Sequence, residues 1–173
     1  MQKRQSDGAI YFDELAATGR KYFIPYISEY KEIKSGLHVL ETGCGDGGNL
    51  LPFSELWCKV TSVDMAEHRI NDAVRFFAGK NVKGNFIASD IFNLPEQKYK
   101  FDIIICHDVF EHIEDKGSFP FNMRRYIKDN GIVFISFPRG KCHSEDSSKS
   151  AKAQSCHICR SFIYYPVFYT LGF

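Results

Sequence analysis

An apolar run that ends in a glycine-rich turn constrains the fold of this chain more than any other feature. Residues 37–41 read Leu-His-Val-Leu-Glu, and glycine follows at Gly43, Gly45, Gly47 and Gly48. Glycine is needed where the backbone must turn tightly and where a ligand must approach without a Cβ in its way. A strand that leads into such a turn, and then into a helix near Asn49, is typical of a ligand site at the edge of an α/β sheet.

Two further apolar runs end in acids. Residues 60–63 lead into Asp64, about 20 residues after the glycine turn, which is the spacing at which an acid binds ribose hydroxyls. Residues 85–88 are followed by Ser89 and Asp90, and Asp90 supplies an acceptor for the exocyclic amine of adenine. Because the carboxyl ends of parallel strands meet at one edge of a sheet, the three runs together predict an adenosine pocket.

The glycines alone leave two other interpretations open. They are compatible with a turn that binds no ligand, and Gly43, Gly45 and Gly48 also satisfy the G-x-G-x-x-G spacing of a nicotinamide or flavin site. Glu41 argues against a dinucleotide, because its negative charge would lie beside the pyrophosphate. A ligand with a sulfonium and an ammonium group suits that field better, so a dinucleotide oxidoreductase is the weaker alternative.

Helical and apolar segments alternate along the chain. Residues 103–106 are continuously apolar, and with Phe101 they form the apolar part of an expected strand at 101–106 that is buried on both faces. The alternation predicts right-handed crossovers and an α/β fold of Rossmann-like type, with a doubly wound, mostly parallel sheet and helices on both faces. Strands are expected at 37–41, 59–63, 85–88, 101–106 and 131–137, and helices at 11–17, 22–30 (interrupted by Pro25), 49–56, 66–78 and 119–127.

The ordered set of motifs resembles the class I S-adenosylmethionine-dependent methyltransferases. The resemblance rests on residues 41–47, Asp64, Asp90 and residues 108–113, and it covers roughly residues 11–138. It implies S-adenosylmethionine as cofactor, with the glycines beside the methionine part, Asp64 on the ribose and Asp90 with its neighbour on the adenine. The cofactor-binding residues that it implies are Glu41, Gly43, Gly45, Gly47, Asp64, Met65, Asp90, Ile91 and His107.

The chemistry of methyl transfer asks little of the protein. Transfer from a sulfonium is an in-line displacement, so the protein mainly has to position a nucleophile and exclude water. A base is needed only for an acceptor that must lose a proton, and the candidates after the fourth strand are His107, Asp108, Glu111 and His112. We predict His107 and His112 as catalytic residues, and His112 suits a hydroxyl acceptor best because imidazole exchanges protons near neutral pH. Alternatively, Glu111 and His112 only cap and fix the loop.

The charge balance separates this chain from nucleic-acid-binding proteins. Its 173 residues carry 22 Lys and Arg against 21 Asp and Glu, for a net charge of +1, and 44% of them are apolar. These values predict one globular domain and no nucleic-acid partner, and the resemblance implies a small-molecule methyl acceptor. No apolar run reaches the length of a membrane span, and the N-terminal residues are too polar for a signal peptide, so we expect a cytoplasmic location.

The six cysteines form no metal or redox pattern. Cys44, Cys58 and Cys106 fall in or beside expected core elements, where free cysteine behaves as a small apolar residue. Cys156 and Cys159 have C-x-x-C spacing, but no second pair stands at zinc-ribbon distance. No metal is therefore expected.

The sequence divides into three parts. Residues 1–34 are expected to form a helical cap that either covers the site as a lid or packs on the sheet. Residues 35–138 form the expected S-adenosylmethionine-binding core. Residues 139–173 form an atypical tail, in which a Lys- and Ser-rich stretch replaces the helix and closing hairpin that the resemblance implies. The apolar face of the cap comprises Tyr11, Phe12, Leu15 and Tyr22.

Two explanations of the tail are open. In the first, a disordered linker leads to an apolar segment, residues 162–173, that forms a strand or docks on the sheet. In the second, the tail is frameshifted. Permissible codons from about Arg139 onward, read in the alternate frame, encode Trp-Lys-Met-Pro-Phe-Gly-Gly, which resembles the segment after the fifth strand in small methyltransferases. C-terminal strands would then be missing and the edge of the fifth strand exposed, and the chain would be a cofactor-binding remnant without catalytic activity.

Overall fold

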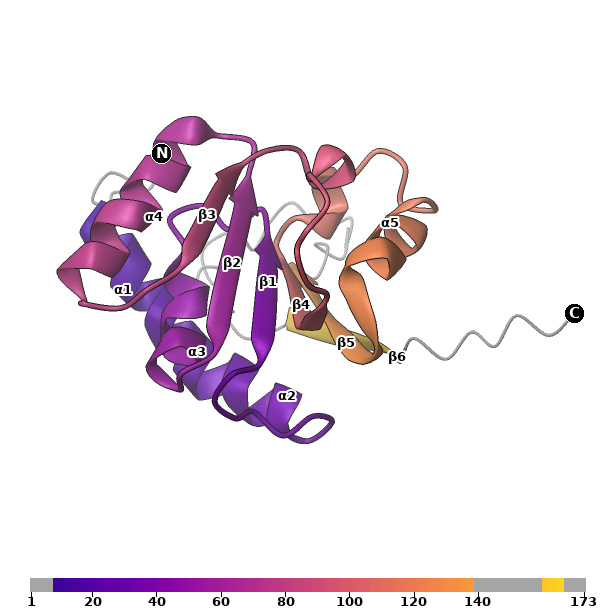
Figure 1. The fold of residues 1–173 in the computed structure, drawn as a ribbon, viewed down its shortest axis with the longest axis horizontal. Coiled ribbons are helices and arrows are strands. Elements are labelled where there is room, and N and C mark those ends of the chain that lie inside the picture. The colour runs from indigo at the N-terminus through magenta and orange to yellow at the C-terminus, as the bar shows by residue number, and fades with distance from the viewer. Residues whose placement is uncertain (1–7, 139–159, 167–173) are drawn as a thin grey trace, which may run out of the picture.

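The computed structural model describes residues 8–138 and 160–166 (Figure 1). The chain alternates between helices and strands, and several of its connections contain a short π or 3-10 turn, labelled η. The elements in chain order are α1 (Gly8–Thr18), η2 (Gly19–Phe23), α2 (Ile24–Ser28), β1 (His38–Thr42), η3 (Gly48–Leu50), α3 (Leu51–Glu55), β2 (Lys59–Asp64), α4 (Glu67–Gly79), β3 (Asn85–Ala88), η4 (Ile91–Asn93), β4 (Phe101–His107), η5 (Phe110–His112), α5 (Phe119–Tyr126), β5 (Ile127–Pro138) and β6 (Arg160–Pro166).

The strands form one sheet of six strands in the order β3-β2-β1-β4-β5-β6. Strands β1 to β5 run parallel, and β6 pairs antiparallel with β5, with Ile132 opposite Pro166 and Pro138 opposite Arg160. The predicted doubly wound, mostly parallel sheet is therefore confirmed. A strand near the C-terminus is present at β6, and it covers the edge of β5 that a loss of C-terminal strands was expected to expose.

Helices cover both faces of the sheet. Helices α1 to α4 lie on one face and α5 lies on the other (Figure 1). Alternate residues of β4 serve the two layers: Ile103 and Ile105 pack with the first, and Ile104 and Cys106 pack with the second. A strand that is buried on both faces is mostly apolar, and the run Ile103–Cys106 made β4 recognisable in the sequence.

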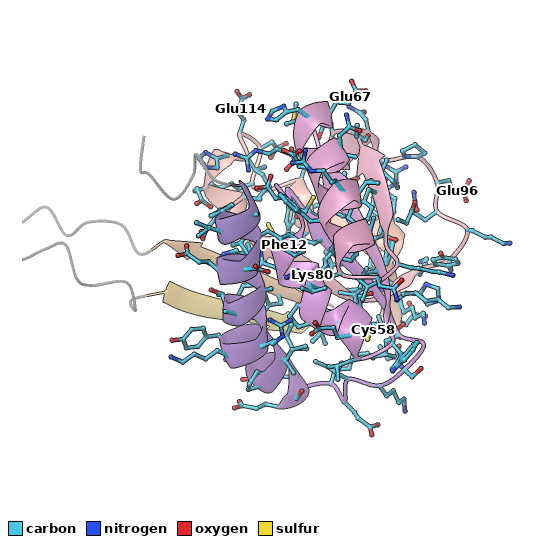
Figure 2. All side chains as sticks on the ribbon, turned by 90° about the vertical axis from the view of Figure 1, so that its left-hand side faces the viewer. Phe12, Cys58, Glu67, Lys80, Glu96 and Glu114 are labelled. Carbon is cyan, nitrogen blue, oxygen red and sulfur yellow. The ribbon has the colours of Figure 1, made fainter. Side chains whose placement is uncertain are left out.

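The N-terminal helices form one path from residue 8 to residue 28, and Pro25 does not break it. Pro25 lies in the first turn of α2 and supplies no backbone N–H to the helix. The preceding η2 is a π-helical turn, which takes up the irregularity. In Figure 2, α1 lies alongside α4, and Lys80 pairs with Asp13 at 2.7 Å between these helices. Phe12, only 1% exposed, joins α1 to the core.

The two edges of the sheet have different roles. At the amino edge, Asp102 accepts hydrogen bonds from Lys128 Nζ (2.8 Å) and from the backbone N–H of His38 (2.9 Å), which ties β1, β4 and β5 together. Figure 2 shows Glu67, at the start of α4, and Glu114, after β4, at one end of the molecule. That end is the carboxyl edge, where the glycine turn and the acids also lie.

Candidate functional site

Two cavities at the carboxyl edge of the sheet share Gly43 and Asp64 as lining residues. The first has a volume of about 200 Å³ and is bounded by the glycine turn, α1 and the end of β4. The second has a volume of about 600 Å³ and is bounded by the ends of β2 and β3 and by the loop after β4. The predicted residues that line the first are Gly43, Gly45, Asp64 and His107; those that line the second are Gly43, Asp64, Met65, Asp90, Ile91 and His112.

The glycine turn has a left-handed backbone at Gly43 (φ 62°), Gly45 (φ 51°) and Gly47 (φ 80°). A Cβ at Gly43 would overlap Val109, which closes over the turn from the loop after β4. Both its conformation and the available space therefore require glycine at position 43. Gly47 is not among the residues that line either cavity; a Cβ there would lie 3.2 Å from Ala73 Cβ, so Gly47 lets the turn approach α4.

Asp64 fixes the turn from the end of β2. Its Oδ2 accepts a hydrogen bond from the backbone N–H of Gly45, and its Oδ1 accepts one from that of Ala66, each at 2.8 Å. A carboxylate oxygen has more than one lone-pair site, so Asp64 can accept hydrogen bonds from ligand hydroxyls while it holds the turn.

Glu41 lies beneath the turn. It is 1% exposed, and its Oε1 accepts a hydrogen bond from Asn49 Nδ2 at 2.8 Å. Burial raises the pKa of Glu41 to about 8; the Asn49 hydrogen bond opposes this shift, and the charge of Asp64 adds to it. The carboxyl of Glu41 is therefore mostly neutral near pH 7 in the free protein. A cation bound nearby would favour the ionised carboxylate, whose negative charge was assumed in the sequence analysis.

Two buried side-chain oxygens have no hydrogen-bond partner among the described residues, and the one on Glu41 becomes an acceptor when that carboxyl is ionised. They are Oε2 of Glu41 and Oδ1 of Asn49, and Asn49 itself lines the cavity. Unsatisfied buried acceptors are costly, so they mark a place where a ligand donor would be stabilised.

His107 ends β4 and lines the first cavity. Its Nδ1 hydrogen-bonds with the Ser136 hydroxyl on β5, and its Nε2 lies 3.5 Å from Asp108 Oδ2. The ring packs edge-on against Phe23, with centroids 5.0 Å apart, so its orientation is fixed on three sides. Asp108 lines the same cavity with φ 53°, a conformation that is strained for a residue with a Cβ.

The second cavity has the more apolar lining of the two. Asp90 caps η4 at its wall: Oδ1 accepts from the backbone N–H of Phe92 at 3.0 Å, and Oδ2 accepts from Asn93 Nδ2 at 3.2 Å. Met65, which is 77% exposed, stands at its rim. The apolar residues around it are Val63, Met65, Ile91, Phe92, Val109 and Ile113.

The two predicted catalytic histidines line different cavities. His112 belongs to η5 and lines the second cavity with Asp90 and Ile91, whereas His107 lines the first. Glu111 is not among the residues that line either cavity. The structure therefore does not bring the two histidines together in one cavity.

The sequence analysis placed Tyr11 and Leu15 on the apolar face of the cap, which either covers the site or packs on the sheet, and it did not single out Arg69; all three line the first cavity. Tyr11 and Leu15 come from α1, which approaches closely because residue 48 is glycine: a Cβ there would overlap the carbonyl oxygen of Phe12. The cap therefore packs on the core and also forms part of the cavity wall. Arg69 lies in the first turn of α4, where a basic residue is usually solvated, so no pattern marked it.

The buried thiols are structural. Cys44, Cys58 and Cys106 are free and buried, and burial raises the pKa of Cys58 to about 11 and that of Cys106 to about 12. Cys156 and Cys159 lie outside the described residues.

Within residues 8–138 and 160–166, no group of three or more His, Cys, Asp or Glu side chains could hold a metal ion. In the same part of the chain, no helix has both the length and the apolar character needed to cross a membrane.

The fold and the site define a class of protein. An open, doubly wound sheet with a glycine turn after its first strand, and with acids after its second and third, is typical of α/β proteins that bind a nucleoside-containing cofactor. The methyltransferase domain family matches residues 33–172. The chain therefore belongs to the methyltransferase domain family.

Similar proteins include a group of curated bacterial enzymes. A ubiquinone biosynthesis O-methyltransferase of Rickettsia canadensis (strain McKiel) is 34% identical over 116 residues, which make up 67% of this chain and 49% of that protein. A protein of the same name from Rickettsia conorii (strain ATCC VR-613 / Malish 7) is 31% identical over 126 residues, 71% of this chain and 43% of that protein. The chain thus spans about half the length of the curated relatives it matches.

Solved structures share the fold. PKMT2 from Rickettsia typhi, determined in complex with AdoHcy, has a TM-score of 0.60 and 25% identity, over 68% of this chain and 25% of that protein. A SAM-dependent methyltransferase from Aquifex aeolicus has a TM-score of 0.64 and 21% identity, over 78% of this chain and 77% of that protein. The second similarity is evidence for the fold alone.

Proposed function

We propose that this chain is an S-adenosylmethionine-dependent methyltransferase that acts on a small-molecule acceptor. The observation that carries the proposal is the pair of cavities that share Gly43 and Asp64. An elongated ligand with a polar amino-acid end and an aromatic nucleoside end suits such a pair, because the first cavity is the more polar and the second the more apolar. Membership of the methyltransferase domain family, and a similar structure solved with AdoHcy, support it.

The second cavity suits the adenosine part. We assign Asp64 to the ribose hydroxyls, for which its carboxylate retains lone-pair sites. We assign Asp90 and Ile91 to the edge of the adenine, and Met65 to its face, since all three line this cavity.

The first cavity suits the methionine part. Gly43 and Gly45 bring the backbone close to the ligand, and Gly47 allows the turn to fold behind them. Glu41 acts from beneath the turn through Asn49, and their unsatisfied oxygens suit the ammonium group of the ligand. S-adenosylmethionine, when bound, would supply a methyl group on a sulfonium that is already a good leaving group.

We assign the acceptor atom as oxygen, because the curated relatives are named O-methyltransferases. His107 is our first candidate for the base: with its Nδ1–H donating to Ser136, its Nε2 carries the lone pair that takes the proton of an acceptor hydroxyl. His112 is the second candidate, from the neighbouring cavity. His107 is buried and packs against Phe23, which limits the access of water to the imidazole.

Methyl transfer tests this proposal directly. The 173-residue chain, given S-adenosylmethionine with a labelled methyl group, is expected to label small phenols and not amines. His107→Gln should lower kcat by about 10²-fold or more, the usual contribution of a general base, and His112→Gln should leave kcat within a few fold. Retained cofactor binding with no labelling of any acceptor would favour the alternative, a cofactor-binding remnant.

We also propose a cytoplasmic location and an acceptor other than nucleic acid. A reducing compartment suits the free thiols of Cys44, Cys58 and Cys106. The net charge of +1 gives no excess of positive charge for a phosphate backbone.

A further inference from the structure

We infer that Arg69 binds the carboxylate at the amino-acid end of the cofactor and so positions the methionine part in the first cavity. The inference rests on the proposed function and adds to it a residue outside the motifs that carried the resemblance.

Arg69 reaches the cavity across the glycine turn. It lies in the first turn of α4, and its Nη1 is 3.0 Å from the point where a Cβ of Gly45 would stand. A Cβ at residue 45 would crowd the guanidinium in this place, and glycine leaves it room. Arg69 lines the first cavity together with Tyr11 and His107 and is not among the residues that line the second, to which we assigned the adenine.

Charge makes Arg69 the natural partner of a carboxylate. Among the described residues that line the two cavities, Arg69 is the only Lys or Arg. The acids that line them are Asp64 and Asp108 in the first, and Asp64, Asp90, Glu114 and Asp115 in the second. A sulfonium and an ammonium group are attracted by such a field, but a ligand carboxylate is repelled everywhere except beside the guanidinium.

The ion pair that Arg69 makes within the protein leaves donors for a ligand. Its Nη1 lies 3.7 Å from Asp46 Oδ1, which is longer than a direct hydrogen bond. A guanidinium has five N–H donors in a planar fork, so it can meet Asp46 and a second carboxylate together. The side chain of Asp46 is 10% exposed and that of Arg69 is 43% exposed, so Asp46 holds Arg69 from the protein side while its solvent side stays accessible.

Two ligands that differ only in the carboxylate test the assignment without a catalytic assay. We would titrate the full chain with S-adenosylhomocysteine and with decarboxylated S-adenosylhomocysteine by calorimetry. The wild type should prefer the first by about tenfold or more, the range of a charge-assisted hydrogen bond at a partly exposed site. Arg69→Gln should bind S-adenosylhomocysteine about tenfold more weakly and lose the preference, with little change for the decarboxylated ligand. Arg69→Lys should keep part of it.

Arg75→Gln is the matched control, because Arg75 lies on the same helix and pairs with Asp72 at 2.9 Å on an exposed face. It should keep the wild-type preference. The inference would be overturned if Arg69→Gln weakened the affinity for both ligands equally. It would also be overturned if the wild type bound both ligands with the same affinity, and this second result does not depend on any variant. Failure of the wild type to bind either ligand would instead contradict the proposed function.

Discussion

Glu41 and the glycines of the turn show how single residues set the properties of the site. The carboxyl of Glu41 is buried beneath Gly43 and Gly45, beside the charge of Asp64, and only Asn49 among these neighbours donates to it. Its neutral form is favoured in the free protein, and a cation in the first cavity would reverse that preference. We therefore expect proton release from Glu41 to accompany the binding of a cationic ligand.

The same burial predicts how stability depends on pH. Because the pKa of Glu41 is raised from 4.5 to about 8 in the folded protein, its contribution to stability is complete below about 4.5 and is lost as pH rises through about 8. Thermal melts across this range should show Glu41→Gln gaining stability over the wild type as pH rises. Glu32→Gln, which alters a side chain that is 79% exposed, is the control and should follow the wild type. A constant difference between Glu41→Gln and the wild type would contradict the burial of a neutral carboxyl.

Substitutions at two glycines with a positive φ distinguish the cost of backbone strain from the cost of a steric overlap. Gly43→Ala (φ 62°) adds a Cβ that overlaps Val109, whereas Gly36→Ala (φ 85°) adds one that meets nothing within 4 Å. Both should lower the free energy of unfolding, by about 1 kcal/mol for Gly36→Ala and by more for Gly43→Ala. Only Gly43→Ala should also weaken S-adenosylhomocysteine binding, which calorimetry would measure. Equal affinity in the two variants would remove Gly43 from the site.

At the scale of elements, the strands were predictable to within a few residues because buried parallel strands are mostly apolar runs, as in β4. The acids of the site were predictable because Asp64 ends β2 and Asp90 follows β3, at the edge where the carboxyl ends of parallel strands meet. The division into two cavities was not predictable. It depends on where the loop after β4 places Val109 and His112, and loop positions follow from tertiary packing that no local pattern encodes.

The N-terminal helix illustrates the same limit. Its pattern indicated an apolar face, but the face is divided: Phe12 packs in the core, and Tyr11 and Leu15 line the cavity. The sequence pattern cannot distinguish the core residues of this face from those that line the cavity, because the difference depends on Gly48, which lets α1 approach the turn. The part proposed for Arg69 was hidden for a similar reason, because it depends on how α4 packs beside the turn, where Gly45 leaves room for the guanidinium.

The packing of α1 predicts a large effect for one aromatic residue and a small one for another. Phe12 is 1% exposed and lies 5.0 Å from Phe76 and 6.1 Å from Phe77 between ring centroids. Phe12→Ala should lower the free energy of unfolding by about 3–5 kcal/mol, as for other buried phenylalanines. Phe121→Ala, at a residue of α5 that is 77% exposed, should change it by less than about 0.5 kcal/mol. Denaturant titrations would measure both values, and similar values would mean that α1 is not anchored in the core.

At the scale of the whole molecule, β1 to β5 form a parallel sheet with the site at its carboxyl edge, and β6 closes the far side of β5. Residues 139–159 and 167–173 lie outside the described part of the chain. The pairing of β6 does not decide between the two explanations of the tail, because the aromatic residues of 160–166 have a high strand propensity under either explanation.

The gene sequence tests the frameshift hypothesis. We expect the alternate frame, from about Arg139 onward, to encode Trp-Lys-Met-Pro-Phe-Gly-Gly. Restoring that frame should increase solubility and methyl-transfer activity, since the acceptor side of the fold would be completed. Codons that cannot produce this string would contradict the hypothesis and leave the present tail as the native one.

The central claim is that Gly43 and Asp64 join the two cavities into one cofactor site, and a titration with S-adenosylhomocysteine tests it most directly. Calorimetry on the full chain should give a dissociation constant in the micromolar range. Asp64→Asn should weaken binding by about tenfold or more, because it removes the charged acceptor for the ribose hydroxyls. Asp72→Asn, at the exposed partner of Arg75, should not weaken it. A folded wild type that releases no heat of binding, or an Asp64→Asn variant with unchanged affinity, would contradict the claim.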